Sequence, residues 1–123
     1  MDRILIIEDD ESVKSELASL LAARGYMPVF ELPCDLALLD VNLPNESGFS
    51  VCRRIKSEQG VPVILLTARS GTEDELSGFG AGADDYVRKP YNAEVLMARI
   101  ERLLTRFGLP VCDEQADFTR IAE

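Results

Sequence analysis

The chain has 123 residues, with 13 basic and 22 acidic side chains and a net charge of −9. This length fits one domain with a single core, and the acidic excess argues against a nucleic-acid-binding surface on this segment. The absence of histidine excludes Ser-His-Asp and Cys-His catalysis and histidine-based metal sites. Any chemistry must therefore rest on carboxylates, hydroxyls and lysine.

The distribution of cysteines and apolar residues predicts the cellular setting. Cys34, Cys52 and Cys112 are widely spaced and form no Cys-x-x-Cys motif, which indicates reduced thiols in a cytoplasmic protein. No apolar run approaches the ~18 residues of a membrane span, and the first residues lack the layout of a signal peptide. We expect no membrane contact.

Predicted strands and helices alternate along the chain. Apolar runs predict strands at residues 3–7, 36–40, 61–67 and 85–88. Helical spacing of apolar residues predicts helices at residues 11–24, 49–59, 72–79 and 92–107. Residues 26–30 can form one further short strand, although Pro28 confines it to a sheet edge or a strand start. This alternation predicts a parallel α/β sheet with right-handed crossovers.

Asp40 ends the most apolar strand. The run Leu36-Ala37-Leu38-Leu39 leads directly into this aspartate, and an all-apolar strand is typical of a sheet buried on both faces. Ligands bind at the carboxyl ends of strands in open α/β sheets, where an aspartate can act as a nucleophile toward phosphorus. The alternative is an ordinary turn or helix-capping aspartate.

An acidic cluster follows the first strand. Glu8, Asp9 and Asp10 are adjacent, and three neighbouring carboxylates repel one another unless a cation joins them. An oxygen-only ligand set suits Mg²⁺ or Mn²⁺. The alternative is an acidic loop that caps the next helix.

The parallel arrangement of the strands should bring the acidic cluster and Asp40 together with a hydroxyl and a lysine. The third and fourth apolar strands end at Thr67 and Lys89, so a hydroxyl and a cation should lie on the same edge as Asp40. We expect the acidic cluster and Asp40 to hold the metal, with the backbone carbonyl of Asn42 completing its shell. Thr67 and Lys89 would each contact a phosphoryl oxygen, because phosphoryl transfer needs mainly positioning and charge neutralisation.

Several segments resemble the receiver domain of two-component response regulators. They are residues 3–10, Leu38-Leu39-Asp40, Leu43-Pro44 with Ser47-Gly48, residues 65–69 and residues 82–91. The last segment is especially similar to the winged-helix, OmpR/PhoB-like subfamily. The resemblance covers residues 2–107 and implies a flavodoxin-like (CheY-like) fold. Residues 1–107 would form the receiver domain, and residues 108–123 a linker or disordered tail.

The resemblance also implies roles for individual residues. Asp40 would be the phosphoacceptor, Glu8 and Asp9 the acidic pair, and Asp10 a weaker third ligand. Thr67 and Tyr86 would form a conformational switch pair, and the Lys89–Pro90 peptide bond would be cis.

The same resemblance implies partners. A sensor histidine kinase would donate the phosphoryl group, and the helix 72–79, strand 85–88 and helix 92–107 face would form a homodimer. Asp85 and Arg99 are in place for one ion pair of that dimer, while Glu75 stands where the family commonly has a basic residue. Such a domain is no enzyme beyond Mg²⁺-dependent self-phosphorylation from phosphohistidine or small phosphodonors.

One departure from the family pattern concerns residues 26–35. The family has a helix between its second and third strands, and only five residues, 31–35, separate the corresponding segments here. Because a parallel crossover usually needs a dozen or more residues, we expect either a four-stranded sheet or a strand exchanged with a second subunit. Both predict a non-standard dimer through the first strand or residues 26–35.

This departure leaves a second functional alternative. A receiver that has lost a supporting helix can persist as a degenerate, phosphorylation-independent module for protein interaction and dimerisation. Incubation with Mg²⁺ and a phosphodonor distinguishes the two.

Overall fold

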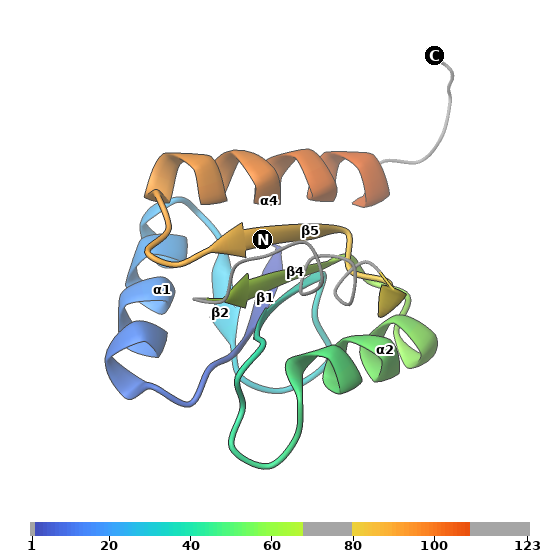
Figure 1. The fold of residues 1–123 in the computed structure, drawn as a ribbon. Coiled ribbons are helices and arrows are strands. Elements are labelled where there is room, and N and C mark those ends of the chain that lie inside the picture. The colour runs from blue at the N-terminus through green and yellow to red at the C-terminus, as the bar shows by residue number, and fades with distance from the viewer. Residues whose placement is uncertain (1, 68–79, 109–123) are drawn as a thin grey trace.

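The computed structural model describes residues 2–67 and 80–108, which form one parallel five-stranded sheet with helices on both faces (Figure 1). The strands are β1 (Arg3–Ile7), β2 (Met27–Val29), β3 (Leu36–Asp40), β4 (Val63–Thr67) and β5 (Asp85–Arg88), in the order β2-β1-β3-β4-β5. The helices are α1 (Glu11–Ala23), α2 (Gly48–Glu58) and α4 (Ala93–Gly108). The predicted parallel α/β architecture is confirmed, while the predicted helix at 72–79 and the segment after residue 108 lie outside the described residues.

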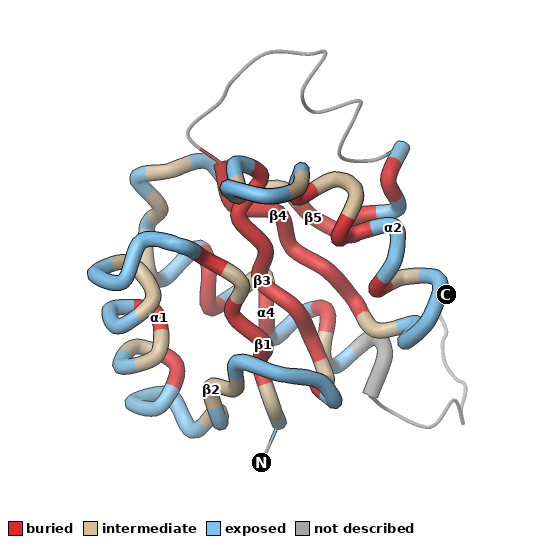
Figure 2. Tube along the Cα trace, turned by 90° about the horizontal axis from the view of Figure 1, so that it is seen from below, coloured by how far each residue is buried: buried red, intermediate tan, exposed pale blue. Residues whose placement is uncertain are grey.

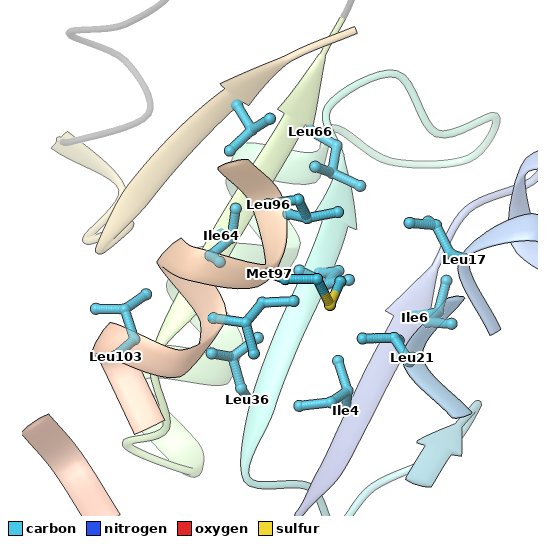
Figure 3. Close-up of a cluster of buried hydrophobic side chains, with 13 residues drawn as sticks. Ile4, Ile6, Leu17, Leu21, Leu36, Ile64, Leu66, Leu96, Met97 and Leu103 are labelled. Atoms are coloured by element: carbon cyan, nitrogen blue, oxygen red, sulfur yellow. The ribbon is translucent and has the colours of Figure 1, made fainter. Parts of the chain in front are cut away.

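Strand periodicity divides the core between the two faces of the sheet. Successive side chains of a strand point to opposite faces, so Ile4 and Ile6 of β1 pack toward α1 and α4. Figure 3 shows Leu17 and Leu21 of α1 on this face, with apolar side chains of α4 beside them. None of the helices in the described ranges is long and apolar enough to cross a bilayer.

The opposite face is covered mainly by α2. Leu5 of β1, Ala37 and Leu39 of β3 and Leu65 of β4 pack there with residues of α2. In Figure 2, α2 lies along one side of this face, and the exposed chain that follows β2 passes in front of β1. This connection and α2 therefore lie on the same face of the sheet.

The expectation of a four-stranded sheet is wrong. β2 pairs in parallel with β1 of the same chain, with Met27 opposite Arg3 and Val29 opposite Leu5. The edge of β1 is therefore covered within one subunit, and the sheet is complete without an exchanged strand. The helix between β2 and β3 is absent, as predicted, because residues 30–35 connect the two strands directly.

The short connection works because β2 is short. β2 ends opposite Leu5, and β3 begins at Leu36 opposite Ile4, so the chain hardly has to return along the strand direction. It crosses only β1, a lateral distance of about two strand spacings, or ~10 Å, and six residues reach ~20 Å. Asp35 secures the end of the crossover, since its backbone N–H donates to Arg3 O at 2.8 Å and its carboxylate accepts from Arg3 N at 2.7 Å.

Candidate functional site

The predicted site residues lie together at one edge of the sheet. β1, β3, β4 and β5 are parallel neighbours, so their carboxyl ends are adjacent. Glu8 and Asp9 follow β1, Asp40 ends β3, Thr67 ends β4, and Lys89 follows β5. The fold thus brings side chains from four separate segments to a single rim, as the strand pattern predicts.

Three carboxylates form a cluster at this rim. Glu8, Asp9 and Asp40 each offer one oxygen, and these oxygens lie within 4.8 Å of one another. Glu8 and Asp40 are buried and Asp9 is exposed, so the cluster opens toward solvent at Asp9. An all-oxygen set of this kind fits Mg²⁺ or Mn²⁺, and a cation there would offset the mutual repulsion of the carboxylates.

Lys89 reaches into the same cluster. Its Nζ lies 2.7 Å from Glu8 Oε2 and 3.7 Å from Asp40 Oδ2. The backbone N–H of Lys89 donates to Thr67 O at 2.7 Å, which ties the end of β5 to the end of β4. The Lys89–Pro90 peptide bond is cis, the geometry that the family resemblance implies. The ammonium group is therefore held beside both buried carboxylates.

The backbone after β3 holds Asp40 in place. Asn42 N donates to Asp40 Oδ1 at 3.1 Å, and Val41 N donates to Leu66 O at 3.0 Å. Gly48 N then donates to Val41 O at 2.8 Å, which returns the chain to the pocket at the start of α2. The alternative of an ordinary turn aspartate is therefore only partly correct. Asp40 accepts a turn-type hydrogen bond from Asn42 N, and its carboxylate also belongs to the cluster with Glu8 and Asp9.

Asp10 has a different role from the one considered for it. It is the N-cap of α1, and its side chain accepts from Ser12 N at 2.9 Å and Val13 N at 3.3 Å. Its carboxylate thereby satisfies backbone donors that a helix start leaves without partners. The helix-capping alternative thus describes Asp10, whereas Glu8 and Asp9 join Asp40.

Burial raises the pKa of Asp40. Desolvation is the largest cause, and the neighbouring Glu8 carboxylate acts in the same direction, while the Asn42 N–H and the Lys89 ammonium act against it. Because the carboxyl of the folded protein titrates above that of the unfolded chain, it binds more protons when folded. Ionised Asp40 therefore costs stability, and this cost grows as the pH rises from its unfolded pKa through its folded pKa.

We expect the variant Asp40→Asn, without divalent cations, to be more stable than the wild type at pH 7, because the amide does not ionise. The difference in unfolding free energy should shrink as the pH falls through the raised pKa of folded Asp40, and it should reach its smallest value below the unfolded pKa of aspartate. Urea unfolding of both proteins between pH 3 and pH 8 measures it. Equal or lower stability of the variant at pH 7 would contradict a destabilising charge at this position.

The two residues of the expected switch pair differ in burial. Thr67 is fully buried at the end of β4. Tyr86 is half-buried on β5 and packs against the apolar cluster beneath α2. β4 and β5 pair in parallel with Leu65 opposite Tyr86 and Thr67 opposite Arg88, so the two residues lie on adjacent strands near the same edge.

Gly48 is a site residue that the sequence interpretation did not single out. A Cβ at this position would lie 2.2 Å from Asp40 O and 2.6 Å from Val41 Cα. The backbone of Gly48 therefore packs directly on the backbone that carries Asp40. The signal available in the sequence was the glycine at the end of the turn-rich loop after β3, directly before an amphipathic helix.

Asp85 forms its ion pairs within the chain. Arg99 Nη1 lies 2.9 Å and Arg102 Nη2 3.0 Å from Asp85 Oδ2, so β5 is joined to α4. The expected pairing of Asp85 and Arg99 concerned two subunits, whereas the single chain already satisfies both partners. Glu75, the other residue of that expectation, lies outside the described residues.

A family comparison identifies the class of protein. The model described as "Response regulator receiver domain" matches residues 29–101, which is more than half of the chain. This chain therefore belongs to the response regulator receiver family of two-component systems.

The curated relatives include a transcriptional regulatory protein and a sensory transduction protein. CseB of Streptomyces coelicolor, a "Transcriptional regulatory protein", is 43% identical over 118 residues, which cover 85% of this chain and 50% of the relative. RegX3 of Mycobacterium tuberculosis, a "Sensory transduction protein", is 42% identical over 120 residues, covering 88% of this chain and 53% of the relative. The chain thus spans about half the length of the curated relatives it matches.

A third relative aligns over almost the whole chain. The "DNA-binding response regulator MtrA" of Mycobacterium leprae is 37% identical over 133 aligned residues, covering 98% of this chain and 57% of the relative. That alignment is longer than the 123 residues present here. The relative therefore has residues within the aligned region that this chain lacks.

Solved structures agree with the fold and the subfamily. The "BeF3 Activated DrrB Receiver Domain" has a TM-score of 0.80 and 40% identity, covering 86% of this chain and 99% of that chain. A structure of "Response Regulator DrrB, a Thermotoga maritima OmpR/PhoB Homolog" has a TM-score of 0.79 and 38% identity, covering 93% of this chain and 58% of that one. A CheY-like receiver from Methanospirillum hungatei has a TM-score of 0.80 at 27% identity, covering 86% of this chain and 95% of that chain. The predicted CheY-like fold and the OmpR/PhoB-type resemblance are both confirmed.

Proposed function

We propose that this receiver accepts a phosphoryl group on Asp40 from a phosphohistidine of a sensor kinase. The observation that carries the proposal is the placement of Asp40, buried at the sheet edge, with Lys89 Nζ at 3.7 Å and the Glu8 and Asp9 carboxylates within metal-sharing distance. The chain has no histidine of its own, which suits a donor imidazole on a partner kinase or a small phosphodonor in its place.

The reaction is an in-line displacement at phosphorus. A carboxylate oxygen of Asp40 forms the new P–O bond as the P–N bond of the donor phosphohistidine breaks, and the departing imidazole nitrogen keeps the electron pair. Glu8, Asp9, Asp40 and the backbone carbonyl of Asn42 would hold Mg²⁺ or Mn²⁺, which neutralises charge on the phosphoryl group when bound. Lys89 would exchange its bond with Glu8 for a phosphoryl oxygen, and Thr67 would donate its hydroxyl to another.

The product would bias an existing conformational equilibrium. An inward movement of Thr67 leaves space that the Tyr86 ring can enter from the adjacent strand, and phosphorylation would favour that arrangement. The affected surface is the β5 and α4 face, through which we propose that the phosphorylated chain dimerises. Each Asp85 would then exchange in-chain pairing with Arg99 or Arg102 for pairing across the dimer.

The relatives suggest the wider setting. CseB, described as a transcriptional regulatory protein, and MtrA, described as a DNA-binding response regulator, match this domain. We propose that this receiver also controls transcription, in the cytoplasm, through an output segment distinct from the receiver domain. Receiver domains are generally not enzymes, and Mg²⁺-dependent self-phosphorylation is the only catalysis that we propose. No observation on the described residues favours the degenerate alternative, because the pocket residues come together despite the missing helix.

Metal-dependent phosphorylation tests this function. With acetyl phosphate and Mg²⁺, we expect the intact protein to gain the mass of one phosphoryl group, and to gain none when EDTA is present. Asp9→Asn removes one carboxylate from the cluster and should raise the Mg²⁺ concentration needed for half-maximal labelling by about tenfold or more, a loss of ~1.4 kcal/mol in metal binding.

Asp10→Asn is the matched control for this experiment. Asparagine caps helices as well as aspartate does, so this variant changes a neighbouring charge but preserves the observed capping bonds. Its Mg²⁺ requirement should stay within about twofold of the wild type. Labelling that ignores EDTA, or an effect of Asp10→Asn as large as that of Asp9→Asn, would contradict the metal assignment.

A further inference from the structure

The loop between β3 and α2 carries one of the proposed metal ligands. It leaves the sheet after Asp40 and returns at the start of α2 (Figure 1). The two ends of the loop are joined, because Gly48 N donates to Val41 O at 2.8 Å. Asn42 also pairs with Ser47 in an isolated antiparallel bridge. The position of Asn42, whose backbone carbonyl we propose as a ligand, therefore depends on the position of Ser47 across the loop.

Glu46, the residue before Ser47, is held by side chains of α2. Arg54 Nη1 donates to Glu46 Oε2 at 2.8 Å and Arg54 Nη2 donates to Oε1 at 3.2 Å, so the guanidinium contacts both carboxylate oxygens. Ser50 Oγ donates to Oε2 at 3.0 Å. The bonds from Arg54, and then the bond from Ser50, lower the pKa of Glu46, so its carboxylate is ionised at neutral pH. We call the Glu46–Arg54 pair the loop clamp.

The geometry and the base of the loop clamp both favour a real contribution. Surface ion pairs usually contribute little, and contacts in which an arginine binds both oxygens of a carboxylate are the exception. The helix that presents Arg54 is fixed to the core, because Val51, Cys52 and Ile55 of α2 are buried. Arg54 therefore projects from a support whose position is set by the sheet.

The loop clamp acts on a segment that is mostly exposed. Leu43 packs against the apolar cluster beneath α2, which anchors the first part of the loop. Its neighbours along the loop are exposed, namely Asn42, Pro44, Asn45 and Ser47, and Glu46 anchors the second part. A segment that must become ordered on binding lowers affinity by the entropy that it loses. An anchored loop should therefore bind a cation more tightly than a free one.

We propose that Glu46 and Arg54 are positioning residues for the metal site, because they hold the loop that carries the Asn42 carbonyl before a cation binds. Neither side chain belongs to the three-carboxylate cluster at the rim, so both act on the cation through the loop. This inference rests on the proposed function, in which Asn42 completes the metal shell.

The dependence of stability on Mg²⁺ concentration tests the proposal. A ligand that binds only the folded chain raises the free energy of unfolding by an amount set by its concentration and its Kd. Urea unfolding over a series of Mg²⁺ concentrations therefore gives the Kd of each variant, separately from any stability that the variant loses without metal. We expect Arg54→Met, which keeps an apolar stem, to raise the Kd for Mg²⁺ about threefold, as the loss of a well-aligned surface ion pair allows.

The sign of this effect separates positioning from simple electrostatics. Arg54→Met removes a positive charge, which by itself would favour a nearby cation and lower the Kd, whereas a loosened loop raises the Kd. Arg53→Met is the matched control, because Arg53 is the neighbouring exposed residue of α2 and its replacement makes the same change of charge. The control should leave the Kd unchanged or slightly lower.

Exchange of the two charges provides a rescue. Glu46→Arg combined with Arg54→Glu restores an ion pair at the same positions, and its Kd should lie closer to the wild-type value than that of either single variant. If Arg54→Met bound Mg²⁺ at least as tightly as Arg53→Met, the loop clamp would have no positioning role, while the metal site would stand. A wild-type chain whose stability does not respond to Mg²⁺ would overturn the metal site itself, and this inference with it.

Discussion

Replacement of Asp40 by asparagine is expected to abolish phosphorylation while leaving the fold intact. The amide has nearly the shape of the carboxylate, and its oxygen can still accept the bond that Asn42 N donates at 3.1 Å. It has no anionic oxygen to form the P–O bond. With acetyl phosphate and Mg²⁺, the mass of the variant should match that of the protein incubated without phosphodonor.

The control and the chemistry of the product make this test specific. Asp10→Asn makes the same substitution two residues after Glu8 and should be labelled like the wild type, because its side chain caps α1. The label on the wild type should be released by hydroxylamine, as an acyl phosphate is and a phosphoserine is not. Labelling of Asp40→Asn at any other residue would count against Asp40 as the phosphoacceptor.

Replacement of Gly48 by alanine is expected to destabilise the protein and disturb the site together. The new methyl carbon would lie 2.2 Å from Asp40 O, 2.6 Å from Val41 Cα and 2.9 Å from Asp40 C. These are backbone atoms, which cannot rotate away as a side chain can. Overpacking of this kind costs about 2 kcal/mol, and relief requires the backbone that carries Asp40 to move.

Urea unfolding and the rate of labelling by acetyl phosphate measure the two effects. Gly80→Ala is the matched control, since a Cβ at Gly80 would have no atom of residues 2–67 and 80–108 within 4 Å. We expect that change to alter stability by no more than about 0.5 kcal/mol and to leave labelling unchanged. If the two variants behaved alike, the close approach of Gly48 to Asp40 would not constrain the site.

The crossover after β2 shows where reasoning from chain length failed. The need for a dozen or more residues applies when a crossover must return along a full strand and pack as a helix. β2 has only three residues and ends opposite the middle of β1, so its connection is mainly lateral. The length of β2 is set by its pairing with β1 and by the sharp departure at residue 30, neither of which can be read from the local pattern of residues 26–30.

The partners of charged side chains show a related limit of prediction from sequence. The sequence placed Asp10 in one cluster with Glu8 and Asp9, but helix geometry turns its carboxylate toward the amides of Ser12 and Val13. The sequence also placed Asp85 and Arg99 on a shared dimer surface. In the structure, α4 packs beside β5, and both Arg99 and Arg102 form ion pairs with the Asp85 carboxylate of the same chain. Which partner a charged side chain takes depends on backbone direction and neighbouring elements.

The sequence by itself determined the parallel α/β architecture, because apolar runs and helical spacing alternate along the chain. It also determined which residues share the rim, since parallel strands place Glu8, Asp40, Thr67 and Lys89 at adjacent carboxyl ends. Only the tertiary structure decided how β2 reaches β3 and why Gly48 must lack a side chain. These features depend on distances between segments that are far apart in sequence, which residue patterns do not encode directly.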